Sequence, residues 1–285
     1  MLSCYTTSLL GHLRGRVPDA DERFREAIGL SVRVDLPAGD LAFEQHRPVD
    51  PTLRYRGTAD WDSARQGLLT ELGRAGDVIV VANCRNLPWS PSFRGEDTPH
   101  WLRLNDHRDG RWSVVDDFDA LLPLGHQQPY HGRLSDAELR ELLAPLPALP
   151  LALHRRDVHA LGAPVDVPAP GTYRWLEHGP AGAAARAEEG RWVRGTGEAL
   201  AYLARRLVED PVALRRHTED LWAAARHHQY RLDDDEEAVA AWGELARSLR
   251  FAVQSADRGR PRPTLITRAF DRIEQAHAER REVAL

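Results

Sequence analysis

Lysine is absent from this chain, and all 38 basic residues are arginines. Together with frequent alanine and leucine, this bias indicates a GC-rich genome rather than a particular function. Acidic residues outnumber the arginines, so the net charge is -5 and the isoelectric point is about 6.2. General nucleic-acid and anionic-membrane binders depend on a basic surface. We therefore expect neither nucleic acid nor a membrane among the partners.

Cysteine is also scarce, with two residues in 285 and no CxxC pair. This excludes a disulfide framework and a thiolate zinc site, and it favours a reducing compartment. No apolar run approaches the ~18 residues of a membrane span, and no basic segment followed by an apolar run marks a signal peptide. We expect a cytoplasmic protein. The 42% hydrophobic and 28% charged content is typical of one large or two ordinary globular domains.

Hydrophobic periodicity predicts an α+β protein with a change of character near residue 196. The preceding part mixes helices and strands, whereas the remainder is helical almost throughout. We predict a catalytic domain over 1–145, a Pro/Gly-rich connecting segment over 146–195 and an all-α bundle over 196–285. Helices are expected at 19–28, 60–73, 135–143, 198–209, 212–230, 236–256 and 264–282. Strands are expected at 30–36 and 78–82, and a hairpin with arms 100–105 and 111–115. The segment 37–58 is expected to be a loop, apart from a strand at 41–45.

Cys4 stands where the first helix is about to begin, because Leu9, Leu10 and Leu13 recur on one helical face. The threonines and serine at 6–8 can satisfy free amides of the first turn. The unpaired N–H groups and the dipole at a helix start favour thiolate over thiol. Cys4 is therefore the candidate nucleophile, although a lone cysteine is usually a small buried apolar residue.

The expected hairpin brings His100, at the start of its first arm, near Asp116 and Asp117, at the end of its second. Strand side chains alternate between faces, so only one of the two aspartates can point to the imidazole. An activated cysteine needs such a set, because the imidazole pairs with the thiolate and protonates the leaving group while the carboxylate orients the ring. The predicted set is Cys4, His100 and one of the two aspartates, Asp116 or Asp117.

Four segments resemble the N-terminal domain of the butirosin biosynthesis H family, a papain-like family related to bacteriocin leader peptidases. They are Ser3-Cys4-Tyr5-Thr6-Thr7-Ser8-Leu9, Asn86-Leu87-Pro88-Trp89-Ser90-Pro91, Pro99-His100-Trp101-Leu102 and Trp112-Ser113-Val114-Val115-Asp116. The resemblance covers roughly residues 1–125. It implies a papain-like cysteine-protease fold and a thioester formed on Cys4, with His100 as the base and acid and Asp116 as the orienting carboxylate. The implied acyl donor is the phosphopantetheine arm of an acyl or peptidyl carrier protein, and the implied acceptor is a small-molecule amine.

The residues around the triad carry further hypotheses. Papain-like peptidases usually place a glutamine several residues before the cysteine, and only three residues precede Cys4 here. The oxyanion hole is therefore assigned to backbone amides at Cys4 or Tyr5, with Asn83 as a side-chain candidate. Trp89 is a candidate for lining an acyl pocket.

Several alternatives stay open at this point. Cys84 could be the nucleophile, but it lies in a loop after a strand and lacks a helix start. His100, Asp106 and His107 could hold a metal, but the latter two lie in a turn where polar residues are common, so we expect no metal and no bound cofactor. The same triad could catalyse hydrolysis of a thioester, amide or peptide. If the triad is vestigial, the protein is a non-catalytic binding partner of a carrier protein. The helical domain could form one side of the active-site cleft, bind the carrier protein or mediate homodimerisation.

Overall fold

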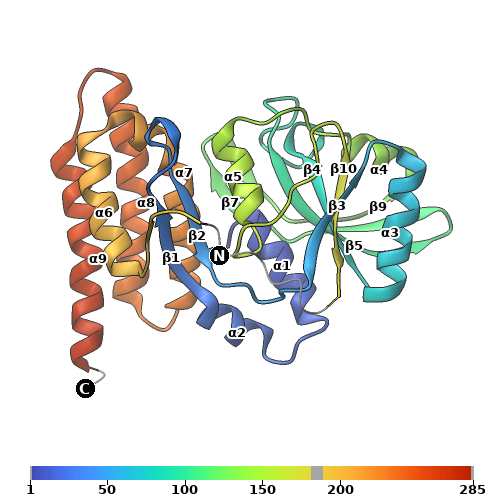
Figure 1. Ribbon diagram of the computed structural model, residues 1–285, viewed down its shortest axis with the longest axis horizontal. Coiled ribbons are helices and arrows are strands. Elements are labelled where there is room, and N and C mark those ends of the chain that lie inside the picture. Colours follow the sequence, from blue (N-terminus) through green and yellow to red (C-terminus); the bar gives the residue numbers. More distant parts are fainter. Residues whose placement is uncertain (1, 181–188, 284–285) are drawn as a thin grey trace. The chain divides into compact units, whose positions relative to one another are not determined.

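The computed structural model describes residues 2–180 and 189–283. The chain divides into two compact units, each assembled from two stretches of sequence. Unit 1 comprises residues 1–24 and 48–187, and unit 2 comprises residues 25–47 and 188–285. Strands dominate the first unit and long helices the second (Figure 1), which confirms the α+β class. Within the described ranges, no helix has the length and apolar character that a membrane crossing requires.

Unit 1 is built on a six-stranded sheet in the order β3-β10-β4-β5-β6-β9, and all of its strand pairs are antiparallel. Strand β4 is apolar up to its last residue, Asn83, and every residue in it is buried, as expected for a strand covered on both faces. A bulge between Leu104 and Asp106 shifts the register of β5 on β6. A separate hairpin of β7 and β8 follows β6. The strands are β3 (Leu53–Thr58), β4 (Val78–Asn83), β5 (Pro99–Arg108), β6 (Arg111–Asp116), β7 (Ala120–Leu122), β8 (Gly125–Gln127), β9 (Tyr130–Ser135) and β10 (Tyr173–His178).

Two helices cover opposite faces of this sheet. Trp61 and Leu68 of α3 share a buried cluster with Leu102 of β5. On α1, the ring of Tyr5 meets the neighbouring Trp101 edge-on, with the ring centroids 4.9 Å apart. Because strand side chains alternate, Trp101 and Leu102 point to opposite faces. The helices in this part of the chain are α1 (Cys4–Arg14), α2 (Ala20–Ala27), α3 (Trp61–Ala75), α4 (Asp136–Leu142) and α5 (Leu151–His159), with a short 3-10 turn η2 (Cys84–Asn86).

Unit 2 packs four helices and a small sheet around one core. The four predicted helices are confirmed, with their ends within two residues of the expected positions. Trp242 and Phe270 are among the largest fully buried side chains. Leu30 and Val32 of β1 and Phe43 of β2 belong to the same apolar cluster. The elements are β1 (Ile28–Arg33), η1 (Pro37–Gly39), β2 (Ala42–His46), β11 (Trp192–Val193), α6 (Thr196–Glu209), α7 (Pro211–Arg231), α8 (Glu236–Asp257) and α9 (Pro263–Val283), with the sheet order β11-β1-β2.

The structure corrects the predicted domain boundaries. The segment 146–195 is not a connector: it contains α5 and β10, and β10 lies inside the main sheet between β3 and β4. The expected loop over 37–58 contains β3, and β1 and β2 belong to the helical unit instead of the catalytic domain. The prolines flanking β10 break any local pattern. Its pairing with β3, more than a hundred positions earlier, comes from tertiary packing that local periodicity does not report.

Candidate active site

Cys4 is the first residue of α1, as the apolar spacing predicts. Ser3 is the N-cap: its hydroxyl accepts from the amide of Thr6 at 3.4 Å, and its own amide donates to the Thr6 hydroxyl at 3.0 Å. This reciprocal capping box fixes the backbone on both sides of the thiol. Of the predicted capping residues, Thr6 has that role, whereas Ser8 donates its hydroxyl to the carbonyl of Trp101 at 2.9 Å. That contact ties α1 to β5.

His100 is 1% exposed, and it interacts electrostatically with both Cys4 and Asp116. Its Nε2 is 2.8 Å from Oδ2 of Asp116, so Nδ1 is the ring nitrogen that this contact does not use. Burial opposes the imidazolium, but the charges of Asp116 and Cys4, with hydrogen bonds to both, raise the pKa of His100 well above its ordinary value. The ring therefore favours the charged form that pairs with a thiolate.

Asp116, at the end of β6, is completely buried and is held by four donors. Its Oδ2 accepts from His100, from Nε1 of Trp89 at 2.8 Å and from Nε2 of Gln127 at 3.1 Å. Its Oδ1 accepts from the amide of Phe118 at 3.1 Å. Burial opposes the charge, yet the charge of His100 and these hydrogen bonds lower the pKa of Asp116, so the carboxylate is ionised.

Asp117 points away from the imidazole, as strand alternation requires. Its Oδ2 accepts from Arg103 at 2.7 Å, and its Oδ1 lies 2.7 Å from Nε2 of His131. The side chain is 39% exposed. Of the two adjacent aspartates, it is Asp116 that the structure brings to His100.

The other predicted site residues have different surroundings from those expected. The amide of Asn83 donates to Asp97 at 2.7 Å, while its oxygen accepts from the backbone of Arg85 and Thr98. It organises the loop after β4, so it is a poor candidate for the oxyanion hole. Trp89 stacks on Tyr130, with ring centroids 3.8 Å apart, and its indole N–H binds Asp116. It supports the carboxylate instead of presenting an open acyl pocket.

The structure does not favour the two alternative sites, which are Cys84 as the nucleophile and a metal site formed by His100, Asp106 and His107. Cys84 is buried and begins η2, where its amide donates to the carbonyl of Thr98. Asp106 pairs with Arg108, and His107 packs on Trp112, both at the turn end of β5 and away from His100 at its start. Across residues 2–180 and 189–283, no group of three or more His, Cys, Asp or Glu side chains is placed to hold a metal ion.

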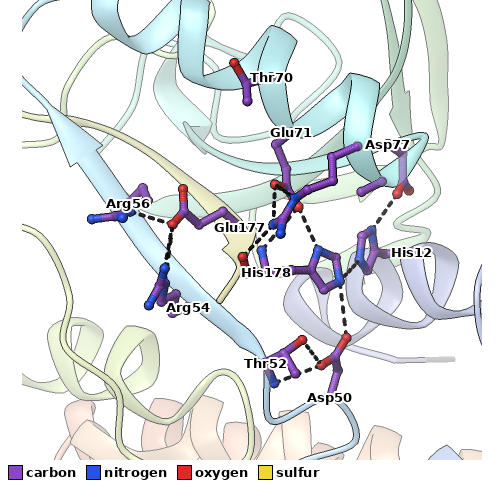
Figure 2. A network of polar contacts seen from close by, with 12 residues as sticks. His12, Asp50, Thr52, Arg54, Arg56, Thr70, Glu71, Asp77, Glu177 and His178 are labelled. Carbon is purple, nitrogen blue, oxygen red and sulfur yellow. Dashed lines mark hydrogen bonds and ion pairs between the residues drawn. The ribbon is translucent and has the colours of Figure 1, made fainter. Parts of the chain in front are cut away.

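A second polar cluster lies toward the other end of α1 (Figure 2). Nδ1 of His12 is 2.5 Å from Oδ1 of Asp77, and its Nε2 is 3.4 Å from Nε2 of His178. His178 in turn contacts Glu71 through Nδ1 at 2.7 Å and Asp50 through Nε2 at 3.3 Å. The cluster links α1, α3 and β10. It anchors the C-terminal part of α1, the helix whose first residue is Cys4.

Sequence analysis missed three buried polar residues that support the site: Gln127, and the pair Asp157 and Arg174. Gln127 is 1% exposed and lies in the β7–β8 hairpin, where no periodicity marks it. Asp157 and Arg174 fall in the segment interpreted as a connector. The only available signal was the burial implied by the apolar neighbours of Arg174 in Tyr173–His178.

Comparison with protein-family models gives no match, and comparison with curated proteins gives none either.

Proposed function

We propose that the protein is a papain-like cysteine enzyme that carries an acyl group as a thioester on Cys4 and transfers it to an amine. The observation that carries this proposal is the placement of a buried His100 between the ionised Asp116 and the thiol at the start of α1. The resemblance of four segments to the butirosin biosynthesis H family supports the hypothesis that the enzyme is an acyltransferase. It also supports a carrier-protein phosphopantetheine thioester as the donor.

In the first half-reaction, the Cys4 thiolate attacks the carbonyl carbon of the donor thioester. The tetrahedral intermediate then collapses, the carbon–sulfur bond to the donor breaks, and His100 gives its proton to the departing thiolate. Asp116 holds the imidazole by Nε2 throughout, which keeps Nδ1 directed to the reacting sulfur. The products are an acyl-Cys4 thioester and the free thiol of the donor.

The start of α1 supplies donors for the developing oxyanion. The amides of Thr6 and Thr7 bond to the side chain and the carbonyl of Ser3. This leaves the N–H groups of Cys4 and Tyr5, the first two helical positions, outside the helix's own bonding. Backbone amides of this kind stabilise a tetrahedral intermediate.

In the second half-reaction an amine attacks the acyl-Cys4 carbonyl, His100 accepts the proton of the amine, and the Cys4 thiolate departs. The product is an amide. Water would follow the same course and give a carboxylic acid. The acceptor therefore decides between transferase and hydrolase.

Intact-protein mass spectrometry with a panel of acyl-pantetheine thioesters tests the proposal. The wild type and a Cys84→Ala variant should gain the acyl mass, whereas Cys4→Ala should not. His100→Ala should acylate more slowly by about 100-fold or more, since general acid–base catalysis contributes about 10²–10⁴-fold. Cys84→Ala is the matched control because it removes the other thiol of the chain.

Added amines then identify the second step. Conversion of the adduct to an amide supports the transferase, and release of the free acid without amide supports a hydrolase. An adduct on Cys84 alone would refute the assignment of the nucleophile. No adduct with any donor, together with a Cys4 that iodoacetamide does not alkylate, would favour a non-catalytic carrier-binding protein.

A further inference from the structure

A buried polar cluster holds the residue that follows Cys4. The hydroxyl of Tyr5 donates to Oδ1 of Asp157 at 2.5 Å, across 152 positions of sequence. Arg174 donates to Oδ2 of the same carboxylate at 3.3 Å, and the hydroxyl of Tyr55 donates to its backbone carbonyl, also at 3.3 Å. The cluster thus joins α1, β3, α5 and β10 at one residue, Asp157.

The carboxyl group of Asp157 is unusually enclosed for a charged residue. Asp157 is 0% exposed and Arg174 is 5% exposed. A buried carboxylate is tolerated when donors surround it, because its loss of hydration is otherwise uncompensated. Both oxygens of Asp157 have a donor, so the carboxyl group is committed to holding its neighbours and is not free to bind substrate.

The cluster also lies within electrostatic reach of the nucleophile. Burial is the largest cause of the raised pKa of Tyr5, and the charges of Asp157 and Cys4 add to it. The same three influences raise the pKa of Tyr55, with Arg174 opposing them. Tyr5 therefore lies within electrostatic reach of both Asp157 and Cys4.

We propose that Asp157 is a positioning residue for the Cys4 chemistry: by its hydrogen bond with Tyr5 it fixes the first turn of α1 and thereby the place of Cys4 beside His100. This inference rests on the proposed function of Cys4. Tyr5 supplies one of the backbone amides assigned to the oxyanion hole, so a displaced Tyr5 side chain would also move that donor. Asp157 itself touches no reacting atom.

The groups around Asp157 make this hold dependent on pH. Burial raises the pKa of Asp157 to about 6, while the hydrogen bond from Tyr5 and the charges of Arg174 and Arg156 oppose the rise. Tyr55 faces its backbone from β3. Above this pH the carboxylate accepts a charge-assisted hydrogen bond from Tyr5, and such bonds are roughly twice as strong as neutral ones. We expect Cys4 to be held more firmly above pH 6 than below it.

The test measures the rate of iodoacetamide alkylation between pH 4.5 and 9, with peptide mapping to separate Cys4 from Cys84. In the wild type the rate for Cys4 should show an upward step near pH 6. Asp157→Asn and Tyr5→Phe should both lose the step and react about tenfold more slowly, because small displacements of a reacting group cost up to ~10²-fold. The double variant should be no slower than either single variant, since both remove the same contact.

Asp136→Asn is the matched control. Asp136 also holds an arginine and an aromatic donor, with Nε of Arg65 at 2.9 Å and Nε1 of Trp112 at 2.6 Å. It should keep both the step and the wild-type rate. Tyr5→Phe removes a single hydroxyl group, so this variant alone can test the contact if Asp157→Asn does not fold.

The outcomes separate the two proposals. A Cys4 that is reactive and dependent on His100, but unchanged by Asp157→Asn and Tyr5→Phe, would refute the positioning role and leave the proposed function standing. A wild-type Cys4 that is inert at every pH would refute the proposed function itself. A step that survives in Asp157→Asn would assign it to another group and overturn the inference.

Discussion

Replacing Asp116 with asparagine is the most direct test of the site. The change keeps the size of the side chain but removes the buried negative charge that His100 faces at 2.8 Å. One of the two terminal atoms becomes an NH₂ group, which cannot accept from Trp89, Gln127 or the Phe118 amide. The imidazolium loses its counter-charge, and its ion pair with the Cys4 thiolate is weakened.

The magnitude follows from the lost charged hydrogen bond. A hydrogen bond to a charged group contributes about 1.5–3 kcal/mol. Since about 1.4 kcal/mol corresponds to tenfold, the population of the thiolate–imidazolium pair should fall by about 10- to 150-fold. Alkylation of Cys4 by iodoacetamide at pH 6 should slow by the same factor, because only the thiolate reacts.

Asp117→Asn is the matched control, since it makes the same change one residue further along. Its carboxylate contacts Arg103 and His131 at the surface, so the rate should stay within about twofold, as exposed ion pairs contribute little. Circular dichroism and thermal unfolding would verify that both variants fold. If Asp116→Asn keeps the full rate while Asp117→Asn loses it, the assignment of the orienting carboxylate is wrong.

Three further predictions concern other parts of the chain. Trp89→Phe keeps an aromatic ring but removes the donor to Asp116, and it should slow alkylation of Cys4 by about tenfold; an unchanged rate would show that this donor is dispensable. The pKa of His178 is raised in the folded protein, chiefly by its hydrogen bond to Asp50. The contribution of His178 to the stability of the fold is therefore complete below the ordinary histidine pKa of about 6.5, and it is lost as the pH rises through the pKa of the folded protein. His178→Gln should therefore lower the free energy of unfolding in urea more at pH 6 than at pH 9, and equal losses would contradict this. Trp242→Ala, at a completely buried site in unit 2, should cost about 3–5 kcal/mol, and a loss below about 1 kcal/mol would indicate a loosely packed core.

Local patterns predicted the elements that have a strong period. The four C-terminal helices follow from stripes such as Leu200, Leu203 and Leu207, all of which are buried. Strand β4 follows from an unbroken apolar run. In contrast, β10 reads as Tyr-Arg-Trp-Leu-Glu-His between prolines, and its place in the sheet depends on partners far away in sequence. Long-range pairing of this kind leaves no local period.

The candidate site divides in the same way. His100 and Asp116 could be brought together from a hairpin, because a hairpin constrains neighbours over a short stretch of sequence. Cys4 could be placed at a helix start, but its nearness to His100 was inferred from the chemistry of an activated cysteine. Gln127 and Asp157 could not, since polar residues in a hairpin and a short helix look like ordinary surface residues. Their burial comes only from packing against elements elsewhere in the unit.

The assignment of β1 and β2 to unit 2 has a consequence for how the protein is made. Leu30, Val32 and Phe43 leave the ribosome well before the helices that bury them, because α6 to α9 lie far downstream of β1 and β2. During synthesis the apolar face of this hairpin stays exposed until the helices are made, and an exposed apolar hairpin is prone to aggregate. A fragment that stops before α6 would keep that hairpin uncovered permanently. Expression of a fragment that lacks α6 to α9 should therefore yield insoluble protein unless residues 25–47 are redesigned.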